Sequence, residues 1–137
     1  TNQALEETDI LVRAVSEILE ISNSACASMD ASLARRIEPL EEVVDSLQEK
    51  LEKEHMRRLK DKECNVEAGV IFLEIISNAE RISDHCSNIG VAILQHDGDV
   101  DNRHDYLRVI HSEMPGNYRE DFEKYREKYL VENGGQA

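Results

Sequence analysis

Hydrophobic residues recur every three or four positions through most of the first 96 residues, which is the spacing of one face of an α-helix. A first run extends from about Leu5 to Met29. A second run follows Asp30, a candidate N-cap, and ends near Lys62. A third run follows the polar turn at residues 61–65 and ends near residue 96. Three long amphipathic helices with short connections predict an antiparallel three-helix bundle over about residues 4–96.

Each predicted helix has one stripe of apolar positions that we expect to face the core. The stripes comprise Leu5, Val12, Val15, Leu19, Cys26 and Met29, widened by Ile18 and Ala25, in the first helix; Leu33, Ile37, Leu40, Val44, Leu47, Leu51 and Leu59 in the second; and Phe72, Ile75, Ala79, Ile82, Cys86, Ile89 and Ile93 in the third. Pro39 interrupts the second stripe, so it either kinks that helix or lies near its start.

If the core stripe of the third helix is centred on Ile82, some apolar residues of that helix lie outside the core, along a line on its outer side. Leu73, Ile76 and Val91 lie on or near this line. A lone three-helix bundle would leave such a line uncovered, and a second copy of the chain could cover it. We therefore expect at least a homodimer.

The segment 96–102, HDGDVDN, breaks the helical pattern. Two shorter amphipathic segments follow at 105–114 and 117–131, separated by Pro115 and Gly116, and predict one or two short helices. We expect two parts: a bundle at 1–97 and a C-terminal helical extension at 98–137, packed on the bundle or on a partner copy. Residues 133–137 should be loosely held.

Composition supports an all-α chain with an aliphatic core, because the 137 residues include two Phe, no Trp, six Gly and two Pro. The formal charge of −13 would repel phosphate backbones, so nucleic acid is not an expected partner. The same charge favours a cationic ligand, although it also simply promotes solubility. Three widely spaced cysteines indicate reduced thiols in a cytosolic setting. The chain begins at Thr1 without Met, which favours a fragment of a longer protein.

Two pairs of acidic residues have the spacing E-x-x-x-D: Glu41 with Asp45, and Glu80 with Asp84. Residues four apart lie on one face of a helix, and the repulsion of an exposed pair costs only about 0.2–0.5 kcal/mol. A solvated acidic face on a structural interaction module therefore explains each pair alone. Two pairs on adjacent helices could instead surround a multivalent cation. Carboxylate ligands suit iron, manganese, magnesium or calcium, and zinc also accepts them.

The remaining chemistry-bearing residues do not indicate an enzyme. His55 falls within an apolar stripe, where a core or helix-end role is expected, whereas His111 has the context of a surface residue. A carboxylate-bridged di-iron enzyme uses two Glu-x-x-His motifs, and this chain offers only Glu52 with His55. We find neither a nucleophile–base pair nor a Gly-rich phosphate loop.

The stretch NAERISDHCSNI at 78–89 resembles the helix signature of PhoU proteins. Upstream, EPLEEVVDSLQEKLEKEHMRRL at 38–59 resembles the preceding PhoU helix. Downstream, RHDYL at 103–107 and FEKYREKYLV at 122–131 resemble the carboxyl-terminal end of bacterial sodium/phosphate cotransporters, which carry a cytoplasmic PhoU-like domain after their membrane helices. The resemblance covers nearly the whole chain.

This resemblance implies a three-helix bundle that regulates phosphate uptake at the cytoplasmic face of the cell membrane, next to the membrane domain of the same transporter. The family's paired E(D)-x-x-x-D motifs bind multinuclear iron or zinc clusters, and by position they fall on Glu41 with Asp45 and Glu80 with Asp84. PhoU proteins have two bundles in tandem, whereas this chain has one, which also favours pairing between copies. Ser83 stands where glycine is common in the family.

Overall fold

The computed structural model describes residues 1–131, and within this range every regular element is a helix. The elements are α1 (Asn2–Ser28), α2 (Ala31–Ala34), α3 (Ile37–Lys60), α4 (Val66–His96), α5 (Arg103–Glu113), α6 (Gly116–Arg126) and a π-helical turn, η1 (Glu127–Val131). The all-α prediction is confirmed. The expectation for residues 133–137 lies outside the described residues.

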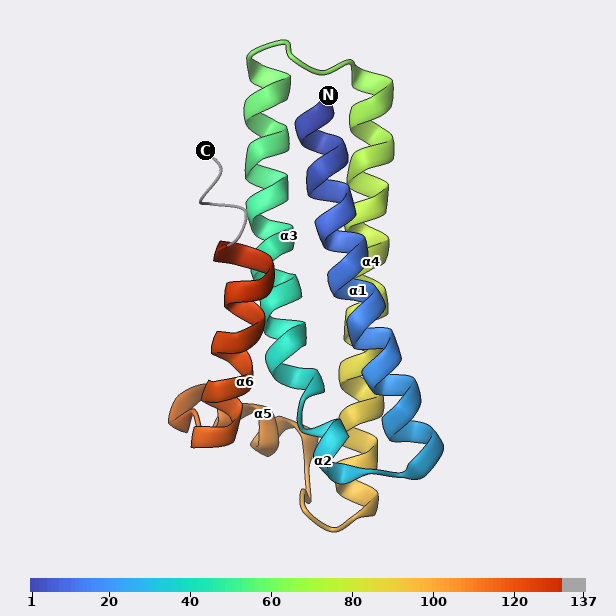
Figure 1. Cartoon of the computed structure of the whole chain (residues 1–137), viewed down its shortest axis with the longest axis vertical. Coiled ribbons are helices and arrows are strands. Elements are labelled where there is room, and N and C mark those ends of the chain that lie inside the picture. Colours follow the sequence, from blue (N-terminus) through green and yellow to red (C-terminus); the bar gives the residue numbers. More distant parts are fainter. Residues whose placement is uncertain (132–137) are drawn as a thin grey trace.

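The long helices α1, α3 and α4 lie side by side as a bundle (Figure 1). The chain runs along α1, returns along α3 and reverses again into α4, so α3 is antiparallel to the other two. The short helix α2 makes the first reversal, and α6 lies beside α3. The predicted antiparallel three-helix bundle is therefore confirmed. The first and third long helices lie within a few residues of the expected bounds, whereas the second begins at Ile37, after the separate α2, and not directly after Asp30.

The helix ends follow from local side-chain chemistry. Thr1 accepts a hydrogen bond from the Ala4 amide at 3.1 Å and so caps α1, and Asn65 caps α4 in the same way. Asp30 is an N-cap, as expected, but of the short α2 rather than of the long second helix. Pro39 is the third residue of α3, where its missing N–H would have no intrahelical partner. Pro39 therefore marks the start of α3 and not a kink.

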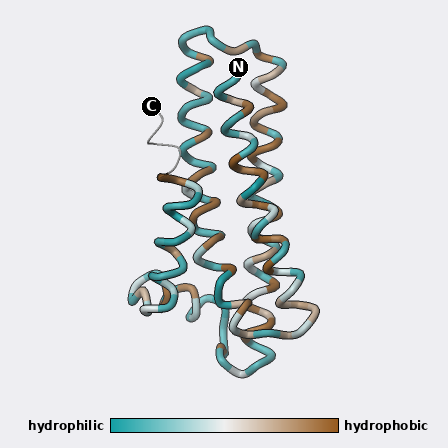
Figure 2. The backbone as a smooth tube through the Cα atoms, viewed as in Figure 1, coloured by the Kyte–Doolittle hydropathy of each residue, from teal (hydrophilic) through white to brown (hydrophobic). Residues whose placement is uncertain are grey.

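The core is aliphatic and runs the length of the bundle. Figure 2, which colours the backbone by hydropathy, shows hydrophobic residues (brown) recurring along all three long helices. In α3 most of the predicted stripe is right: Ile37, Leu40, Val44, Leu47 and Leu51 are each at most 2% exposed. The other two predicted residues are half-buried, and Leu33 belongs to α2 whereas Leu59 lies near the end of α3.

In α4 the predicted core stripe is right at Phe72, Ala79, Cys86 and Ile93, which are at most 7% exposed, and wrong at Ile75, Ile82 and Ile89. Ile76, Ser83 and Gly90, each one residue further along, are buried in their place, so the buried face is rotated by roughly 50° from the predicted one. Ser83 is 0% exposed, whereas Ile75, Ile82 and Ile89 are 37–39% exposed. The buried face consists of Phe72, Ile76, Ala79, Ser83, Cys86, Ser87, Gly90, Val91, Ile93 and Leu94, together with Gly69. Several of these side chains are small, and small side chains let neighbouring helices approach closely. A Cβ built on Gly90 would lie 3.0 Å from Ile37 Cδ1 and 3.3 Å from the Ala34 carbonyl oxygen.

This rotation also corrects the apolar outer line expected from the sequence. Ile76 and Val91 are core residues, 1% and 3% exposed, and only Leu73 remains partly exposed, at 38%. Near or within α1, likewise, five residues that we expected in the core are exposed: Leu5, Val12, Leu19, Cys26 and Met29. Some of the exposed apolar residues of α1 and α4 recur every seven positions, as Leu5, Val12 and Leu19 and as Ile75, Ile82 and Ile89.

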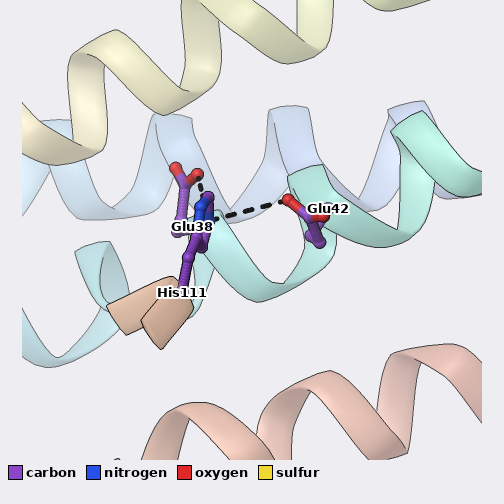
Figure 3. A group of neighbouring side chains, drawn as sticks. All are labelled: Glu38, Glu42 and His111. Atoms are coloured by element: carbon purple, nitrogen blue, oxygen red, sulfur yellow. Dashed lines mark ion pairs between the residues drawn. The ribbon is translucent and has the colours of Figure 1, made fainter. Parts of the chain in front are cut away.

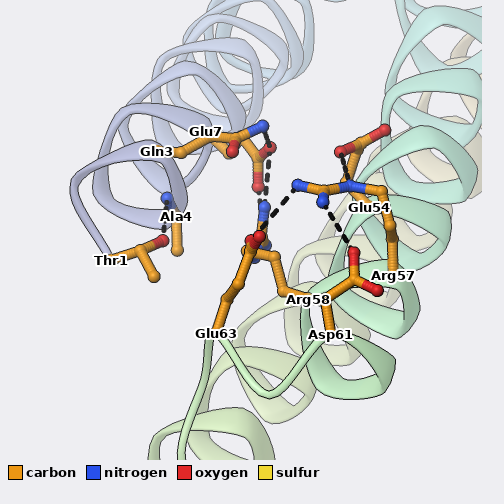
Figure 4. Close-up of polar contacts among 9 residues, drawn as sticks. All are labelled: Thr1, Gln3, Ala4, Glu7, Glu54, Arg57, Arg58, Asp61 and Glu63. Carbon is orange, nitrogen blue, oxygen red and sulfur yellow. Dashed lines mark hydrogen bonds and ion pairs between the residues drawn. The ribbon is translucent and has the colours of Figure 1, made fainter.

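A buried polar group closes the end of the bundle where α1 begins and α3 ends (Figure 4). The Arg58 guanidinium, 1% exposed, pairs with the Glu7 carboxylate at 2.9 Å. Nearby on α3, His55 is also 1% exposed, and its Nε2 atom has no hydrogen-bond partner among the described residues. His55 is thus a core residue, as expected. Arg57, one residue before Arg58, instead forms exposed ion pairs with Glu54, Asp61 and Glu63.

The C-terminal extension packs against α3 through aromatic residues. Tyr125 and Tyr129 are 0% and 2% exposed within the main core cluster. Arg36 donates a hydrogen bond to the Tyr125 hydroxyl at 3.2 Å. On the other side, Lys128 pairs with Glu17 of α1 at 2.8 Å, and Tyr129 donates a hydrogen bond to the same carboxylate. These contacts hold α6 and η1 against α3 and α1. His111 of α5 reaches the amino-terminal half of α3, where acidic residues gather.

Candidate metal centre

Four acidic residues form a row on the amino-terminal half of α3: Glu38, Glu41, Glu42 and Asp45. Their spacing of three, one and three residues places them along one side of the helix. Glu38 and Glu41 are 4% and 7% exposed, which is rare for carboxylates without a compensating charge. We call these four residues the acidic row.

Three carboxylates converge between α3 and α4. Glu41, Asp45 and Asp84 each offer an oxygen, and these oxygens all lie within 4.8 Å of one another. Asp84 is exposed and Asp45 is half-buried, so solvent reaches one side of the group while the bundle encloses the other. A cation surrounded by carboxylates needs this arrangement of oxygen ligands.

The structure thus brings together three of the four residues expected from the sequence. The fourth, Glu80, lies one turn before Asp84 and accepts a hydrogen bond from Gln48 Nε2 at 3.0 Å. Glu80 also raises the pKa of Asp45 electrostatically, as one of several contributors. Glu80 therefore lies near the three converging carboxylates, but its own carboxylate is hydrogen-bonded to Gln48.

A second group of candidate ligands combines Glu38 and Glu42 of the acidic row with His111 of α5 (Figure 3). His111 Nε2 lies 3.5 Å from Glu38 Oε1 and 3.6 Å from Glu42 Oε2. Ser87 of α4 donates a 2.6 Å hydrogen bond to the other Glu38 oxygen, Oε2. Glu38 is thus held in place by α4 while its free oxygen faces the histidine.

The electrostatics of the acidic row penalise its ionised state. Burial raises the pKa of Glu41 above its ordinary value, and the charges of Glu38 and Asp45 raise it further. Burial also raises the pKa of Asp45, to about 6. Burial raises the pKa of Glu38 as well, although the hydrogen bond from Ser87 and the charge of His111 oppose the rise. A multivalent cation would offset this penalty, because it would replace repulsion by attraction.

One unpaired atom also fits a metal ligand. Asp45 Oδ1 is buried and has no hydrogen-bond partner among the described residues. Buried polar atoms without partners are uncommon in folded proteins, and an ion is one of the standard explanations. The donor set of three carboxylates suits a hard or borderline cation. The residues at this position therefore fit the cation that the sequence predicts.

Sequence reasoning missed the group formed by Glu38, Glu42 and His111. Glu38 and Glu42 are four residues apart in the sequence, which places them on one face of a helix. His111 had no signal that linked it to them, because it lies 69 residues after Glu42 and approaches only through the docking of α5.

Comparison with known proteins identifies the family. The PhoU domain model matches residues 9–93, which is more than half of the chain and includes α3 and nearly all of α4. The chain therefore belongs to the PhoU domain family, whose members are regulatory helical domains rather than enzymes, and this membership indicates a regulatory role in phosphate transport. No curated protein and no solved structure matches the chain. None of the helices in the described part of the chain has the length and apolar character needed to cross a membrane.

Proposed function

We propose that this PhoU domain regulates a sodium-dependent phosphate cotransporter from the cytoplasmic face of the cell membrane and binds multivalent metal ions through Glu41, Asp45, Glu80 and Asp84. The observation that carries the metal site is the convergence of the Glu41, Asp45 and Asp84 oxygens within 4.8 Å of one another. Glu80 joins the ligand set if its carboxylate exchanges Gln48 for the ion. Iron or zinc is the proposed ligand.

The link to a cotransporter comes from the C-terminal segments at 103–107 and 122–131, which resemble the ends of such transporters. The proposed partner is the membrane domain of the same transporter. His111 of α5 contacts Glu38 and Glu42 of the acidic row. In this role, metal binding at the row would alter the position of α5, and α5 and α6 would transmit that change to the neighbouring membrane domain.

Metal binding predicts a specific thermal response. Zinc or iron(II) should raise the melting temperature of the wild-type chain, because a ligand that binds only the folded state stabilises it by mass action. Glu80→Gln combined with Asp84→Asn should abolish this rise. Glu67→Gln with Glu74→Gln is the matched control, since it removes two exposed charges from the same helix. Equal rises in both variants would contradict the site.

The regulatory role requires a cellular test. Cells that carry the Glu80→Gln and Asp84→Asn changes in this gene should differ from wild type in sodium-dependent uptake of ³²P-phosphate. The Glu67→Gln and Glu74→Gln control should match wild type. Uptake that is the same in all three strains would contradict a regulatory role for this site in transport.

The alternative function is a structural interaction module without a metal. The observation that favours it is the pair of seven-residue apolar repeats on α1 and α4, namely Leu5, Val12 and Leu19 and Ile75, Ile82 and Ile89. Residues seven apart lie along one line of a helix, so each repeat offers an apolar line to another helix. The two functions are compatible. Because Ile76 and Val91 are buried, the line expected to form the dimer cannot do so, and we propose instead that the chain forms a homodimer through these repeats.

A further inference from the structure

The group Glu38, Glu42 and His111 lies outside the paired E-x-x-x-D motifs and joins two parts of the chain. Glu38 and Glu42 belong to the bundle, whereas His111 belongs to α5 in the extension, beyond the matched PhoU region. One ligand atom from each residue lies within 4.8 Å of the other two. Two carboxylates and an imidazole from different elements therefore meet at one point, as Figure 3 shows.

The distances between these three residues are longer than those of a hydrogen-bonded ion pair. His111 Nε2 is 3.5 Å from Glu38 Oε1 and 3.6 Å from Glu42 Oε2. A charge-assisted N–H···O bond is about 2.7–2.9 Å long. The imidazole lies nearly midway between the two acids and makes a short bond to neither, so all three atoms have room to contract onto a shared ion at about 2.0–2.2 Å.

Glu41, next to this group in the acidic row, is a buried acid without a basic partner. It is only 7% exposed, and no Lys, Arg or His side chain forms an ion pair with it among the described residues. When Glu41 is ionised, its charge adds to those of Glu38 and Glu42, and a cation held by the neighbouring group would reduce the resulting repulsion.

We propose that His111 completes a second metal subsite with Glu38 and Glu42, so that binding of a transition-metal ion clamps the C-terminal extension to the bundle. The inference rests on the proposed function, because both groups share the acidic row, but it adds a nitrogen ligand and a mechanical consequence. An ion held by both elements ties α5 to α3. Loss of the ion leaves α5 attached through the longer contacts of His111 and through the packing of Tyr106 and Ile110.

The ligand chemistry selects the class of ion. Imidazole nitrogen suits zinc, iron and nickel, whereas magnesium and calcium prefer oxygen ligands alone. The subsite should therefore discriminate zinc from magnesium more strongly than a site of carboxylates alone. Ser87 strengthens this arrangement because its hydrogen bond to Glu38 Oε2 leaves Oε1 directed toward the ion.

The test titrates zinc chloride into the ¹⁵N-labelled 137-residue chain at pH 7 and follows the histidine side-chain nitrogens by NMR. His111→Ala assigns the His111 signal, and His104→Ala on the same helix is the control. Zinc should shift the His111 Nε2 signal. It should also slow hydrogen exchange in the 103–113 segment at least about tenfold, because a bound ion removes the local opening of α5.

His111→Ala should weaken zinc binding at least about tenfold, since loss of an outer-shell partner alone typically costs 10–100-fold. It should also remove the zinc-dependent protection of residues 103–113 from hydrogen exchange. His104→Ala should retain both the zinc affinity and this protection. Zinc uptake with an unshifted His111 and unchanged affinity in His111→Ala would overturn this inference and leave the proposed function standing. His111-dependent binding that survives Glu80→Gln with Asp84→Asn, with no loss of ions bound, would support the inference and contradict the motif site. No zinc uptake at all would overturn both.

Discussion

Ser87 of α4 donates a 2.6 Å hydrogen bond to the buried carboxylate of Glu38 on α3. This contact joins the two helices that carry the candidate ligands. Because Ser87 lies one turn after Ser83 and Asp84, the same stretch of α4 packs against α3 and presents Asp84 to Glu41 and Asp45. The acidic row is therefore held by the packing of the bundle and does not depend on flexible loops.

Ser87→Ala should destabilise the metal-free chain by about 1–3 kcal/mol, because it leaves a buried carboxylate oxygen without its donor. Urea denaturation in the presence of EDTA measures this change. Ser77→Ala, at an exposed position on the same helix, is the matched control and should lie within about 0.5 kcal/mol of wild type. Equal effects of the two substitutions would show that the Ser87 hydrogen bond is unimportant for stability.

The stability of the metal-free chain should fall as the pH rises above about 4. The folded-state pKa values of Glu41 and Asp45 are raised, so the folded state retains protons that the unfolded state releases. For Asp45 the loss extends through a pH of about 6. Glu41→Gln removes one titrating group and should flatten the profile. Urea denaturation between pH 4 and pH 8 checks it, and parallel wild-type and variant profiles would contradict the raised pKa of Glu41.

Metal binding near pH 7 should release protons, because a carboxylate must be deprotonated to act as a ligand. The raised pKa of Glu41 means that part of the acidic row is protonated before the ion binds. Calorimetric titration with zinc in two buffers of different ionisation enthalpy measures the number of protons released. Binding heats that are identical after correction for zinc–buffer complexes would indicate no release.

Gly90→Ala should destabilise the fold by about 1–3 kcal/mol through overpacking. The added Cβ would lie 3.0 Å from Ile37 Cδ1 and 3.3 Å from the Ala34 carbonyl oxygen. Gly116→Ala is the control, because a Cβ there meets nothing within 4 Å. Chemical denaturation compares the two. A Gly90→Ala variant as stable as wild type would show that α4 can move away from α2 and α3 at little cost.

Leu19→Glu combined with Ile82→Glu should convert a homodimer to a monomer, if the seven-residue repeats of α1 and α4 form the interface. Both side chains are partly exposed in the single chain, at 45% and 37%, so the substitutions should leave the bundle folded. Sedimentation equilibrium measures the assembly, and circular dichroism checks the helix content. A wild-type chain that is monomeric at high micromolar concentration would contradict the dimer itself.

The sequence predicts the bundle and α3 well, because large aliphatic residues define the buried face of α3 at helical spacing. It misplaces one side of the core stripe of α4, where Ser83, Ser87 and Gly90 face the interior and the larger Ile75 and Ile82 flank it. Hydrophobicity alone ranks these positions in the wrong order, since close helix packing favours small side chains.

The candidate ligands, too, are only partly predictable from the sequence. The E-x-x-x-D spacing identifies Glu41, Asp45 and Asp84 because it reflects local helix geometry. The position of His111 depends on how α5 and α6 dock against α3 through buried residues such as Tyr125. That docking is a tertiary property without a local sequence signal.

The most direct test of the central claim is anomalous X-ray scattering from crystals of the chain grown with zinc. We predict an anomalous peak about 2.0–2.2 Å from carboxylate oxygens of Glu41, Asp45 and Asp84. The peak should be absent from crystals of the Asp45→Asn and Asp84→Asn double variant grown in the same way. Wild-type crystals with zinc bound elsewhere, or with no zinc near these three residues, would contradict the claim that this PhoU domain holds a metal ion between α3 and α4.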